Sequence, residues 1–327
     1  MKKKIKNILV TGGAGYIGSH IVEQLIKTRA KVFIIDNLST GYKKLVNKKA
    51  FFINGDINDV SKTKKIIKDK NINSIIHLAA LLNVREAEKY KKKYYYNNVL
   101  GTLNLIKACK NSNVKNIIFS SSCSIYGNVN GSVNEIKKPN PHGYYAYTKY
   151  KCEQIIKKYS KDYKYNYAIL RYFNVAGASN SNKIGEIQRS HGHLIKNLAI
   201  QALKKKPKIF IYGKNYHTKD GTCIRDYIHV ADLSDIHLKS LYFIDKNSKS
   251  LILNCGYGKG YSVLDVINIF KKIKKNLLII YSKRRAGDVA EVFADVKKMK
   301  KTLKWKPKYN NMSKIIKSAI KWERKLI

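Results

Sequence analysis

The chain has 327 residues, of which 44% are hydrophobic and 11% aromatic, so it is long enough for one large or two moderate domains. That composition excludes a disordered or fibrous protein. The formal net charge is +45, from 66 Lys and Arg against 21 Asp and Glu. Only eight of the 66 are Arg, and the lysines are dispersed among many Ile, Asn and Tyr, a bias that AT-rich codons produce. We therefore expect loose attraction to polyanions and no specific nucleic-acid partner.

Several other classes of protein are also excluded. No apolar run reaches the roughly 18 residues of a membrane-spanning helix, and the first lysines lead only into a short apolar stretch, which is too short for a signal peptide. The five cysteines are dispersed and form no Cys-x-x-Cys pair, which indicates a reducing compartment. His191 and His193 lack the spacing of a zinc helix. We expect a cytoplasmic protein that binds neither a metal nor a membrane.

Strands and helices are predicted to alternate over the first half of the chain. The first strand is the apolar run at residues 8–10, and a glycine-rich turn and a helix with Ile17, Ile21 and Leu25 on one face follow it. Further strands are expected at residues 32–35, 50–53, 74–78, 117–120 and 167–170. This alternation predicts an α/β fold of the Rossmann type, a doubly wound parallel sheet. Beyond about residue 174 the pattern is irregular, so we expect a smaller C-terminal α/β region there.

The glycine-rich turn has the character of a dinucleotide site. Gly12, Gly15 and Gly18 have the spacing G-x-x-G-x-x-G between a strand and a helix, where the backbone can approach a pyrophosphate at the helix N-terminus. Asp36, at the end of the second strand, can accept the ribose hydroxyls of NAD and would repel the 2′-phosphate of NADP. Asp56, after the third strand, can reach the adenine. A tight turn without a ligand is the alternative, and Asp36 makes it the weaker one.

A second motif indicates general acid–base chemistry. Tyr145 and Lys149 are four residues apart and so share a helix face. A nearby ammonium and a positively charged nicotinamide would lower the pKa of the phenol, and a drop of about three units corresponds to roughly 4 kcal/mol. Tyr145 would then be a general base near pH 7. The pattern is weak in a chain so rich in Tyr and Lys, but residues 120–122, three serines at a strand's carboxyl end, support it. A polar strand end with a turn is the alternative for these serines.

With Arg171-Tyr172-Phe173-Asn174, these motifs resemble the extended short-chain dehydrogenase/reductases and, within them, the UDP-glucose 4-epimerases. The resemblance continues through residues 94–99, 220–230, 284–288 and 303–307, so it covers nearly the whole chain, and 220–230 is its most specific part. It implies NAD-dependent inversion at C4 of UDP-glucose and UDP-galactose, through oxidation to a 4-keto sugar, rotation and re-reduction.

The same resemblance implies the organisation of the chain. It suggests an NAD-binding Rossmann domain over residues 1–173, to which some later segments return, and a UDP-sugar-binding region over residues 174–327. It also implies a homodimer formed by helices near residues 89–110 and 150–159.

Individual roles follow from the resemblance. Tyr145 would be the base, Lys149 its electrostatic partner and Ser122 the hydroxyl donor, with Ser121 or Ser124 left open in that role. Arg225 and Arg285 would hold the diphosphate. The residues implied to bind NAD are Gly12, Gly15, Tyr16, Ile17, Gly18, Asp36, Asn37, Asp56, Ile57, Asn98, Tyr145 and Lys149. Those implied to bind the UDP-sugar are Ser122, Asn174, His193, Leu194, Tyr212, Arg225, Arg285 and Asp288.

Three other functions are alternatives to 4-epimerisation of UDP-glucose. Val292 stands where a bulky Tyr often marks members specific for UDP-glucose, so a UDP-N-acetylglucosamine 4-epimerase or a dual-specificity enzyme stays open. A sugar-nucleotide 4,6-dehydratase is excluded, because Cys123 and Ser124 occupy the places where it needs an acid and a base. The alternative from another class is a non-catalytic, NAD-bound scaffold that binds RNA through its lysines. The intact set of Ser, Tyr and Lys argues against it.

Overall fold

The computed structural model of the protein describes residues 6–187, 193–285 and 287–327. Its internal contacts divide the chain into two compact units made of interleaved segments. The first unit contains the chain up to Ile125, Pro141–Arg171 and Ser234–Leu253. The second contains Tyr126–Asn140, Tyr172–Leu233 and Asn254–Ile327. The assignment of separate functions to residues 1–173 and 174–327 stays a prediction.

A seven-stranded sheet in the order β11-β7-β5-β4-β1-β2-β3 forms the centre of the first unit. The pairs β1–β2, β2–β3, β1–β4 and β4–β5 are parallel. The strands are β1 (Asn7–Thr11), β2 (Lys31–Asp36), β3 (Phe51–Asn54), β4 (Ser74–His77), β5 (Asn116–Ser122), β7 (Asn166–Tyr172) and β11 (Leu251–Cys255). The predicted Rossmann-type α/β fold is thus confirmed, and each of the six strands expected from the sequence is present.

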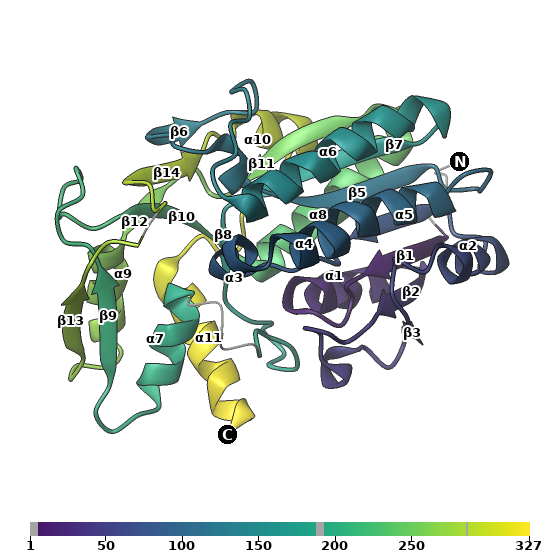
Figure 1. Ribbon diagram of the computed structural model, residues 1–327. Helices are drawn as coiled ribbons and strands as arrows, with labels where there is room; N and C mark the ends of the chain where they lie inside the picture. The colour runs from purple at the N-terminus through teal and green to yellow at the C-terminus, as the bar shows by residue number, and fades with distance from the viewer. Residues whose placement is uncertain (1–5, 188–192, 286) are drawn as a thin grey trace. The chain divides into compact units, whose positions relative to one another are not determined.

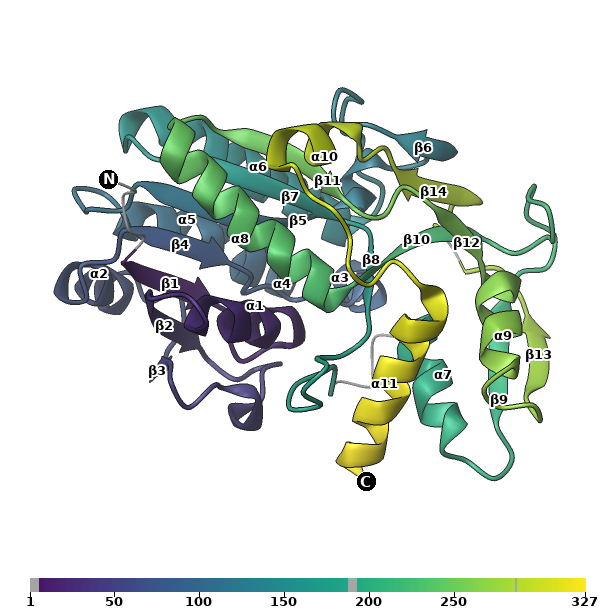
Figure 2. The same cartoon turned by 180° about the vertical axis from the view of Figure 1, so that it is seen from behind.

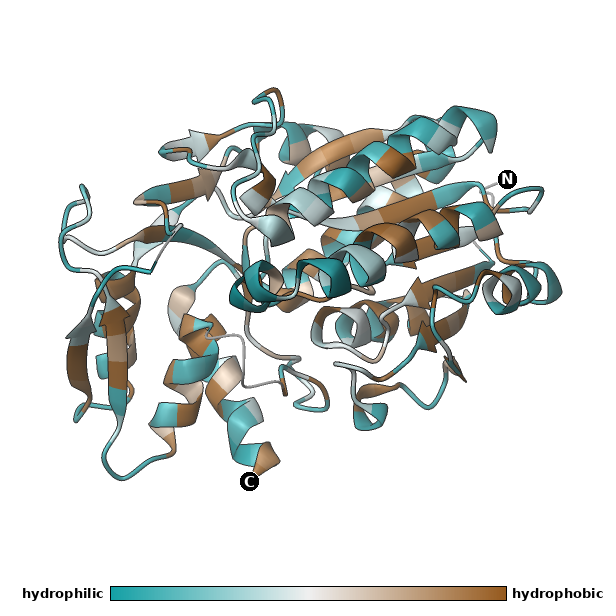
Figure 3. Ribbon diagram, in the orientation of Figure 1, coloured by the Kyte–Doolittle hydropathy of each residue, from teal (hydrophilic) through white to brown (hydrophobic). Residues whose placement is uncertain are grey.

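Helices cover both faces of this sheet. Helices α5 and α6 lie over one face in Figure 1, and α1 and α8 lie over the other in Figure 2. The helical segments are α1 (Tyr16–Ile26), η1 (Lys43–Leu45), α2 (Val60–Asp69), α3 (Val84–Lys89), α4 (Lys91–Tyr94), the π-helix η2 (Tyr95–Leu100), α5 (Gly101–Ala108), η3 (Cys123–Tyr126), α6 (Tyr144–Asp162) and α8 (Val230–Asn247). Because both faces are covered, the strands are largely apolar, as their colours in Figure 3 show.

The start of α6 positions the predicted catalytic helix face. Gly143 precedes the helix with φ of 86°, a conformation that glycine adopts without a steric penalty. The backbone N–H of Tyr144 then donates to Glu88 Oε1 at 2.5 Å. Tyr145 therefore lies in the first turn of α6, and Lys149 lies one turn later.

The second unit contains two smaller sheets. In one, β10 pairs with β8 and β14 in parallel and with β12 antiparallel, and β14 also pairs with β6. In the other, β9 and β13 run parallel. The strands are β6 (Gly131–Val133), β8 (Asn174–Ala176), β9 (Lys208–Tyr212), β10 (Ile224–His229), β12 (Gly260–Ser262), β13 (Leu278–Ser282) and β14 (Glu291–Ala294). The helices are α7 (Leu194–Ala202), α9 (Val263–Lys271), α10 (Lys297–Leu303) and α11 (Met312–Leu326).

Two buried acids organise this second unit. The carboxylate of Asp226, in β10, accepts from the backbone N–H groups of Tyr257, Gly258 and Ala294 at 2.9, 2.8 and 3.2 Å. Burial raises the pKa of Asp226 to about 6, and these hydrogen bonds oppose the rise. Glu323, in α11, forms a buried ion pair with Lys196 of α7, which lies beside it in Figure 1. Asp226 thus fixes the strand that carries Arg225.

Candidate active site

The glycine-rich turn between β1 and α1 leaves no room for side chains. Gly12 has φ of 73°, and a Cβ on it would lie 2.7 Å from the backbone N of Ala79. A Cβ on Gly18 would lie 2.2 Å from the carbonyl O of Gly12. Gly15 is the N-cap of α1 and has no side chain to occupy the N–H groups of the first turn. Such a turn can bring backbone donors to a pyrophosphate.

Asp36 lies at the end of β2, beside this turn. Its carboxylate accepts from the N–H of Ala14 at 2.9 Å and from that of Leu38 at 2.8 Å. Burial raises the pKa of Asp36, and these two hydrogen bonds oppose the rise. Each carboxylate oxygen can accept more than one hydrogen bond, so Asp36 can also accept ribose hydroxyls.

Four other residues predicted to contact the cofactor make contacts within the protein. Asn37 and Asp56 come together, since Asn37 Nδ2 donates to Asp56 Oδ2 at 2.9 Å. Asn98 uses its amide on the protein itself: Oδ1 accepts from the N–H of Leu81 at 2.8 Å and Nδ2 donates to the carbonyl of Leu81 at 3.1 Å. Ile57 is buried in the core of the first unit. Asn98 thus fixes the backbone after β4, a role that the sequence does not reveal.

The predicted catalytic side chains meet in the first unit. Ser122 ends β5 and lies close enough to Tyr145 of α6 for its hydroxyl to act on the pKa of that phenol. Burial raises the pKa of Tyr145, and Ser122 lowers it in part. Lys149 is 2% exposed and its Nζ donates to the carbonyl of Ser120 at 2.8 Å. Burial lowers the pKa of Lys149 to about 8, although Cys152 and Glu153 oppose this.

The electrostatics differ from the expectation of a phenol already made acidic by its surroundings. In the chain by itself, burial is the largest influence on the pKa of Tyr145, and Cys123, Tyr94 and Cys152 act in the same direction, so this pKa lies above the ordinary value. The reason is that the hydroxyl is desolvated while the Lys149 ammonium is directed to a backbone carbonyl. A cationic group brought to Tyr145 by a ligand would act against this effect.

The structure also distinguishes the three serines that the sequence left as candidates. Ser121 Oγ donates to Glu153 Oε1 at 2.6 Å, and Ser124 Oγ donates to Ser122 Oγ at 2.9 Å. Of the three, Ser122 is the serine whose hydroxyl lowers the pKa of Tyr145.

His77, at the end of β4, is a buried residue near the site that the sequence analysis missed. Its Nδ1 lies 2.7 Å from Thr11 Oγ1, and its Nε2 lies 2.9 Å from Thr102 Oγ1. The Thr102 hydroxyl donates to the carbonyl of Asn98 at 2.7 Å, so we assign His77 Nε2 as the donor to Thr102. Burial, helped by the charge of Lys149, lowers the pKa of His77 to about 3. A polar residue within an apolar strand was the available signal.

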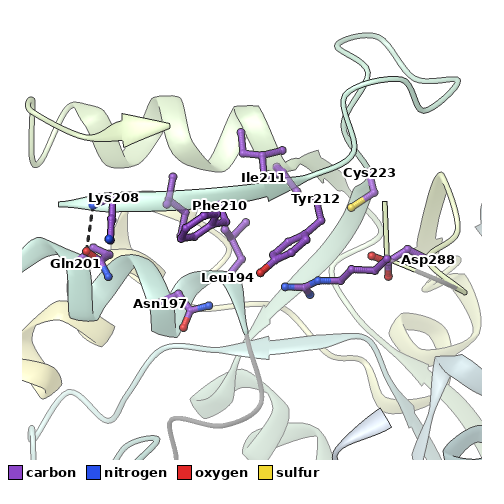
Figure 4. Close-up of a pocket in the computed structure, with 12 residues that line it drawn as sticks. Leu194, Asn197, Gln201, Lys208, Phe210, Ile211, Tyr212, Cys223 and Asp288 are labelled. Carbon is purple, nitrogen blue, oxygen red and sulfur yellow. Dashed lines mark hydrogen bonds between the residues drawn. The ribbon is translucent and has the colours of Figure 1, made fainter. Parts of the chain in front are cut away.

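The second unit contains a cavity of about 290 Å³. Helix α7 and strand β9 carry most of its walls (Figure 4). The lining residues are Leu194, Asn197, Gln201, Lys208, Ile209, Phe210, Ile211, Tyr212, Cys223, Val263, Arg285 and Asp288. Leu194, Tyr212, Arg285 and Asp288 were predicted to bind substrate. Asn197 and Gln201 were missed, although their spacing places both polar side chains on one face of α7.

Cationic groups lie at this cavity. The guanidinium of Arg285 lies 3.9 Å from the centre of the Tyr212 ring. Arg225 Nη2 lies 3.5 Å from Asp288 Oδ1, and its Nη1 donates to the carbonyl of Ile224 at 2.8 Å. Burial raises the pKa of the Cys223 thiol, and the charge of Arg225 opposes the rise. The cavity offers an aromatic face, the Arg285 guanidinium and the Asp288 carboxylate to a ligand, and Arg225 lies beside it through its contact with Asp288.

Three predicted substrate residues of the second unit, Asn174, His193 and Arg225, are not among those that line the cavity. His193 Nδ1 lies 2.8 Å from Glu186 Oε1; burial lowers the pKa of His193, but this contact outweighs burial and the net shift is upward. Asn174 begins β8 opposite Tyr227 in β10, and its side chain is exposed. Within the described ranges, no three His, Cys, Asp or Glu side chains are placed to hold a metal ion. His191 lies outside those ranges.

No helix in the described parts of the chain has both the length and the apolar character of a membrane-spanning segment.

Comparison with known proteins gives consistent matches over most of the chain. Residues 8–256 match the NAD dependent epimerase/dehydratase family. A UDP-glucose 4-epimerase of Lactobacillus helveticus is 41% identical over 319 residues, which cover 97% of each chain.

Two solved structures are also similar to the chain. A UDP-glucose 4-epimerase of Stenotrophomonas maltophila, crystallised with NAD and formylated UDP-arabinopyranose, has a TM-score of 0.94 at 32% identity and covers 98% of both chains. A UDP-Glc/GlcNAc 4-epimerase of Campylobacter jejuni has a TM-score of 0.85 at 38% identity, covering 98% of this chain and 99% of that one. With the glycine turn, Asp36 and the Ser122–Tyr145 contact in place, the chain belongs to the NAD dependent epimerase/dehydratase family, in the branch of the UDP-glucose 4-epimerases.

Proposed function

We propose that this protein interconverts UDP-glucose and UDP-galactose by NAD-dependent inversion of configuration at C4 of the sugar. The observation that carries the proposal is the position of Tyr145 one helical turn before the buried Lys149, whose Nζ donates to the carbonyl of Ser120 in the strand that ends at Ser122. A hydroxyl donor, a phenol and an ammonium are the groups that an alcohol–ketone interconversion needs from the protein. The activity is that of an isomerase.

NAD is the cofactor, and the residues of the first unit fit it. The turn at Gly12, Gly15 and Gly18 would hold the pyrophosphate, because it leads into the N-terminus of α1 with its free N–H groups. Only glycine allows this tight turn, since a Cβ at Gly12 or Gly18 would collide with backbone. Asp36 would hold the adenosine ribose, and Asn37 with Asp56 would border the adenine. When bound, NAD supplies reversible hydride acceptance at C4 of the sugar. Tyr16, Ile17, Ile57 and Asn98 would support this site by packing and by fixing the backbone.

The protein itself moves the proton. Tyr145 Oη would take the proton of the 4-hydroxyl when the sugar is oxidised and return it when the sugar is reduced. Ser122 would donate a hydrogen bond to the same sugar oxygen, and Lys149 would contribute positive charge beside the phenolate. Since burial and neighbouring groups raise the pKa of Tyr145, the phenolate needs this positive charge in order to form near neutral pH.

The second unit would hold the nucleotide. Tyr212 offers a face for the uracil, and Arg225 and Arg285 suit the diphosphate because guanidiniums donate paired hydrogen bonds. Asp288 would accept from the uridine ribose. Asn174, His193 and Leu194 would complete the UDP-sugar site. A firmly held nucleotide and a loosely held sugar allow the 4-keto sugar to turn over between the two transfers.

A second substrate class is favoured by one observation. Val292, in β14, is a small buried side chain whose Cα is the register partner of Arg225 in β10. A small residue leaves more space than a Tyr would, and we propose that UDP-N-acetylglucosamine and UDP-N-acetylgalactosamine are also substrates. The similar Campylobacter jejuni protein is a UDP-Glc/GlcNAc 4-epimerase by name.

The cellular setting is also proposed. Exposed Tyr90, Tyr95 and Tyr96, beside helices α3 and α4, suit a homodimer face formed with the segments near residues 89–110 and 150–159. Five free cysteines suit the cytoplasm, and the activity would serve galactose metabolism. Light scattering of the purified protein tests the dimer, and a monomer at micromolar concentration would contradict it.

The activity is tested by incubating the purified protein with UDP-galactose and, in parallel, with UDP-N-acetylgalactosamine, with and without added NAD. The nucleotide sugars are then separated by chromatography. Conversion of UDP-galactose alone supports the first proposal and contradicts the wider specificity. Conversion of both supports both proposals. If neither reacts even with NAD, the assignment as an epimerase is wrong.

A further inference from the structure

Three consecutive serines of β5 face three successive turns of α6, and two of them form hydrogen bonds with it. The carbonyl of Ser120 accepts from Lys149 Nζ at 2.8 Å, Ser121 Oγ donates to Glu153 Oε1 at 2.6 Å, and Ser122 lies close enough to Tyr145 to lower the pKa of its phenol. Tyr145, Lys149 and Glu153 are spaced by four residues, so they lie along one face of the helix. Figure 1 shows α6 lying along β5 and β7. Glu153 is the member of this row that the proposed chemistry does not use.

Glu153 is held from a second strand as well. Arg171, near the end of β7, donates from Nε to Glu153 Oε1 at 3.0 Å and from Nη2 to Oε2 at 2.8 Å. Both side chains are at most 2% exposed. A two-point Arg–carboxylate pair has a narrow range of geometries, so it fixes separation and rotation together. Glu153 therefore joins β5, α6 and β7 at one point, one turn beyond Lys149.

We propose that Glu153, held by Arg171 and Ser121, is a positioning residue that sets the register of α6 against β5 and thereby places Tyr145 beside Ser122 and Lys149 on the carbonyl of Ser120. A shift of α6 along β5 would lengthen all three contacts together, since they come from neighbouring residues on each element. The inference rests on the proposed function for its consequence in catalysis. The hydrogen-bond arrangement itself stands without it.

The carboxylate of Glu153 also acts on Lys149 through its charge. Its negative charge favours the ammonium form and raises the pKa of Lys149, as does Cys152 on the same helix, while burial lowers it. Other groups around Lys149 are Tyr145 on α6, the ring of Phe119 on β5 at 5.1 Å from Nζ, and neutral His77 on β4. Glu153 is thus the negatively charged group beside Lys149, and Arg171 offsets part of its charge.

The test is the pH dependence of epimerisation by the NAD-loaded protein and its Glu153→Gln variant. We expect kcat near pH 8 to fall about tenfold while KM for UDP-galactose stays within about twofold, because the nucleotide contacts are untouched. The limb at which activity declines with rising pH should move about one pH unit downward, since Lys149 loses the charge that keeps it protonated.

Three further variants separate positioning from folding. Lys157→Gln is the matched control, because Lys157 Nζ lies 4.0 Å from Glu153 Oε2 on the solvent side, and its profile should equal that of the parent. Ser121→Ala removes the bond to β5 without changing any charge, and should lower kcat without moving the limb. The double variant Glu153→Leu/Arg171→Met replaces the pair by apolar groups, which commonly preserves folding, and should still show the lowered limb.

The outcomes decide the proposal. An unchanged kcat and pH limb in Glu153→Gln, an equal shift in Lys157→Gln, or a loss confined to KM would each overturn it. If the parent protein converts neither UDP-sugar, the proposed function fails, and the inference is then judged by NMR titration of ¹³C-labelled lysine. The Lys149 signal is identified by its absence in Lys149→Met. A titration point that moves downward in Glu153→Gln supports the inference, and an unmoved one refutes it.

Discussion

The glycine turn allows a sharp prediction at Gly18. In Gly18→Ala the new Cβ would lie 2.2 Å from the carbonyl O of Gly12 and 2.9 Å from Gly13 Cα. Both contacts are with backbone, which cannot rotate away as a side chain does. Since real Cβ atoms essentially never come closer than 3.0 Å, the start of α1 must move by at least 0.8 Å relative to the turn.

The displacement should affect cofactor binding more than folding. Ala gains up to about 1 kcal/mol over Gly as a helix former, which offsets part of the roughly 1–3 kcal/mol of overpacking. A hydrogen bond of about 2.9 Å from the first turn of α1 to a phosphate, however, would stretch to about 3.7 Å and be lost. Each such charge-assisted bond is worth about 1.5–3 kcal/mol, so NAD should bind about 10–150-fold more weakly.

The assay is calorimetric titration of cofactor-stripped protein with NAD, together with thermal unfolding. Gly55→Ala is the control, because its Cβ would meet side-chain atoms and no backbone, with the flexible end of Lys62 nearest at 3.3 Å from Cε and Ile35 Cδ1 at 3.5 Å. The control should bind NAD as the parent does. The steric argument is refuted if Gly18→Ala binds NAD within twofold of Gly55→Ala.

Three further predictions concern the chemistry, the nucleotide site and the pH dependence of stability. Tyr145→Phe should lower kcat by about 10²–10⁴-fold and leave NAD bound, as measured by turnover and by cofactor absorbance; retained turnover would remove Tyr145 as the base. Arg285→Leu should weaken binding of UDP, measured by calorimetry, by about 10–150-fold, whereas the neighbouring Arg284→Leu should have a much smaller effect; equal losses would contradict the assignment. Because the pKa of His77 is lowered to about 3, its contribution to stability is complete above about pH 6.5 and declines as the pH falls toward 3. The free energy of unfolding, measured in urea, should fall between pH 6.5 and 4.5 by up to about 1.4 kcal/mol per pH unit because of His77. It should fall less in His77→Asn.

The fold could be predicted largely from local pattern. Short apolar runs separated by amphipathic, lysine-rich segments admit few arrangements other than a covered parallel sheet, and the six strands lie within one or two residues of their predicted ends. The three-residue strands β6 and β8 could not be predicted, because so short a run has no periodicity to detect. Their pairing with β14 and β10 depends on residues far away in the chain.

The residues of the candidate site are likewise divided into those that local spacing reveals and those that only folding brings together. Gly12, Gly18 and Asp36 can be recognised in the sequence because their function depends on spacing around one turn. The spacing of Tyr145 and Lys149 likewise reveals a shared helix face.

The partners of these groups come from separate strands and helices. Glu153 meets Arg171 from 18 residues away, and His77 meets Thr11 from 66 residues away. Burial, which raises the pKa of Tyr145 and lowers that of Lys149, likewise depends on packing by distant segments.

The sequence by itself thus determined the strand–helix alternation, the dinucleotide turn and the identities of the chemical groups, since these depend on residues close together in the chain. Only the tertiary structure decided which serine meets Tyr145, what holds α6 against β5, and which polar side chains of α7 line the cavity. Those features are set by hydrogen bonds and packing between residues brought together by folding, and no local spacing records them.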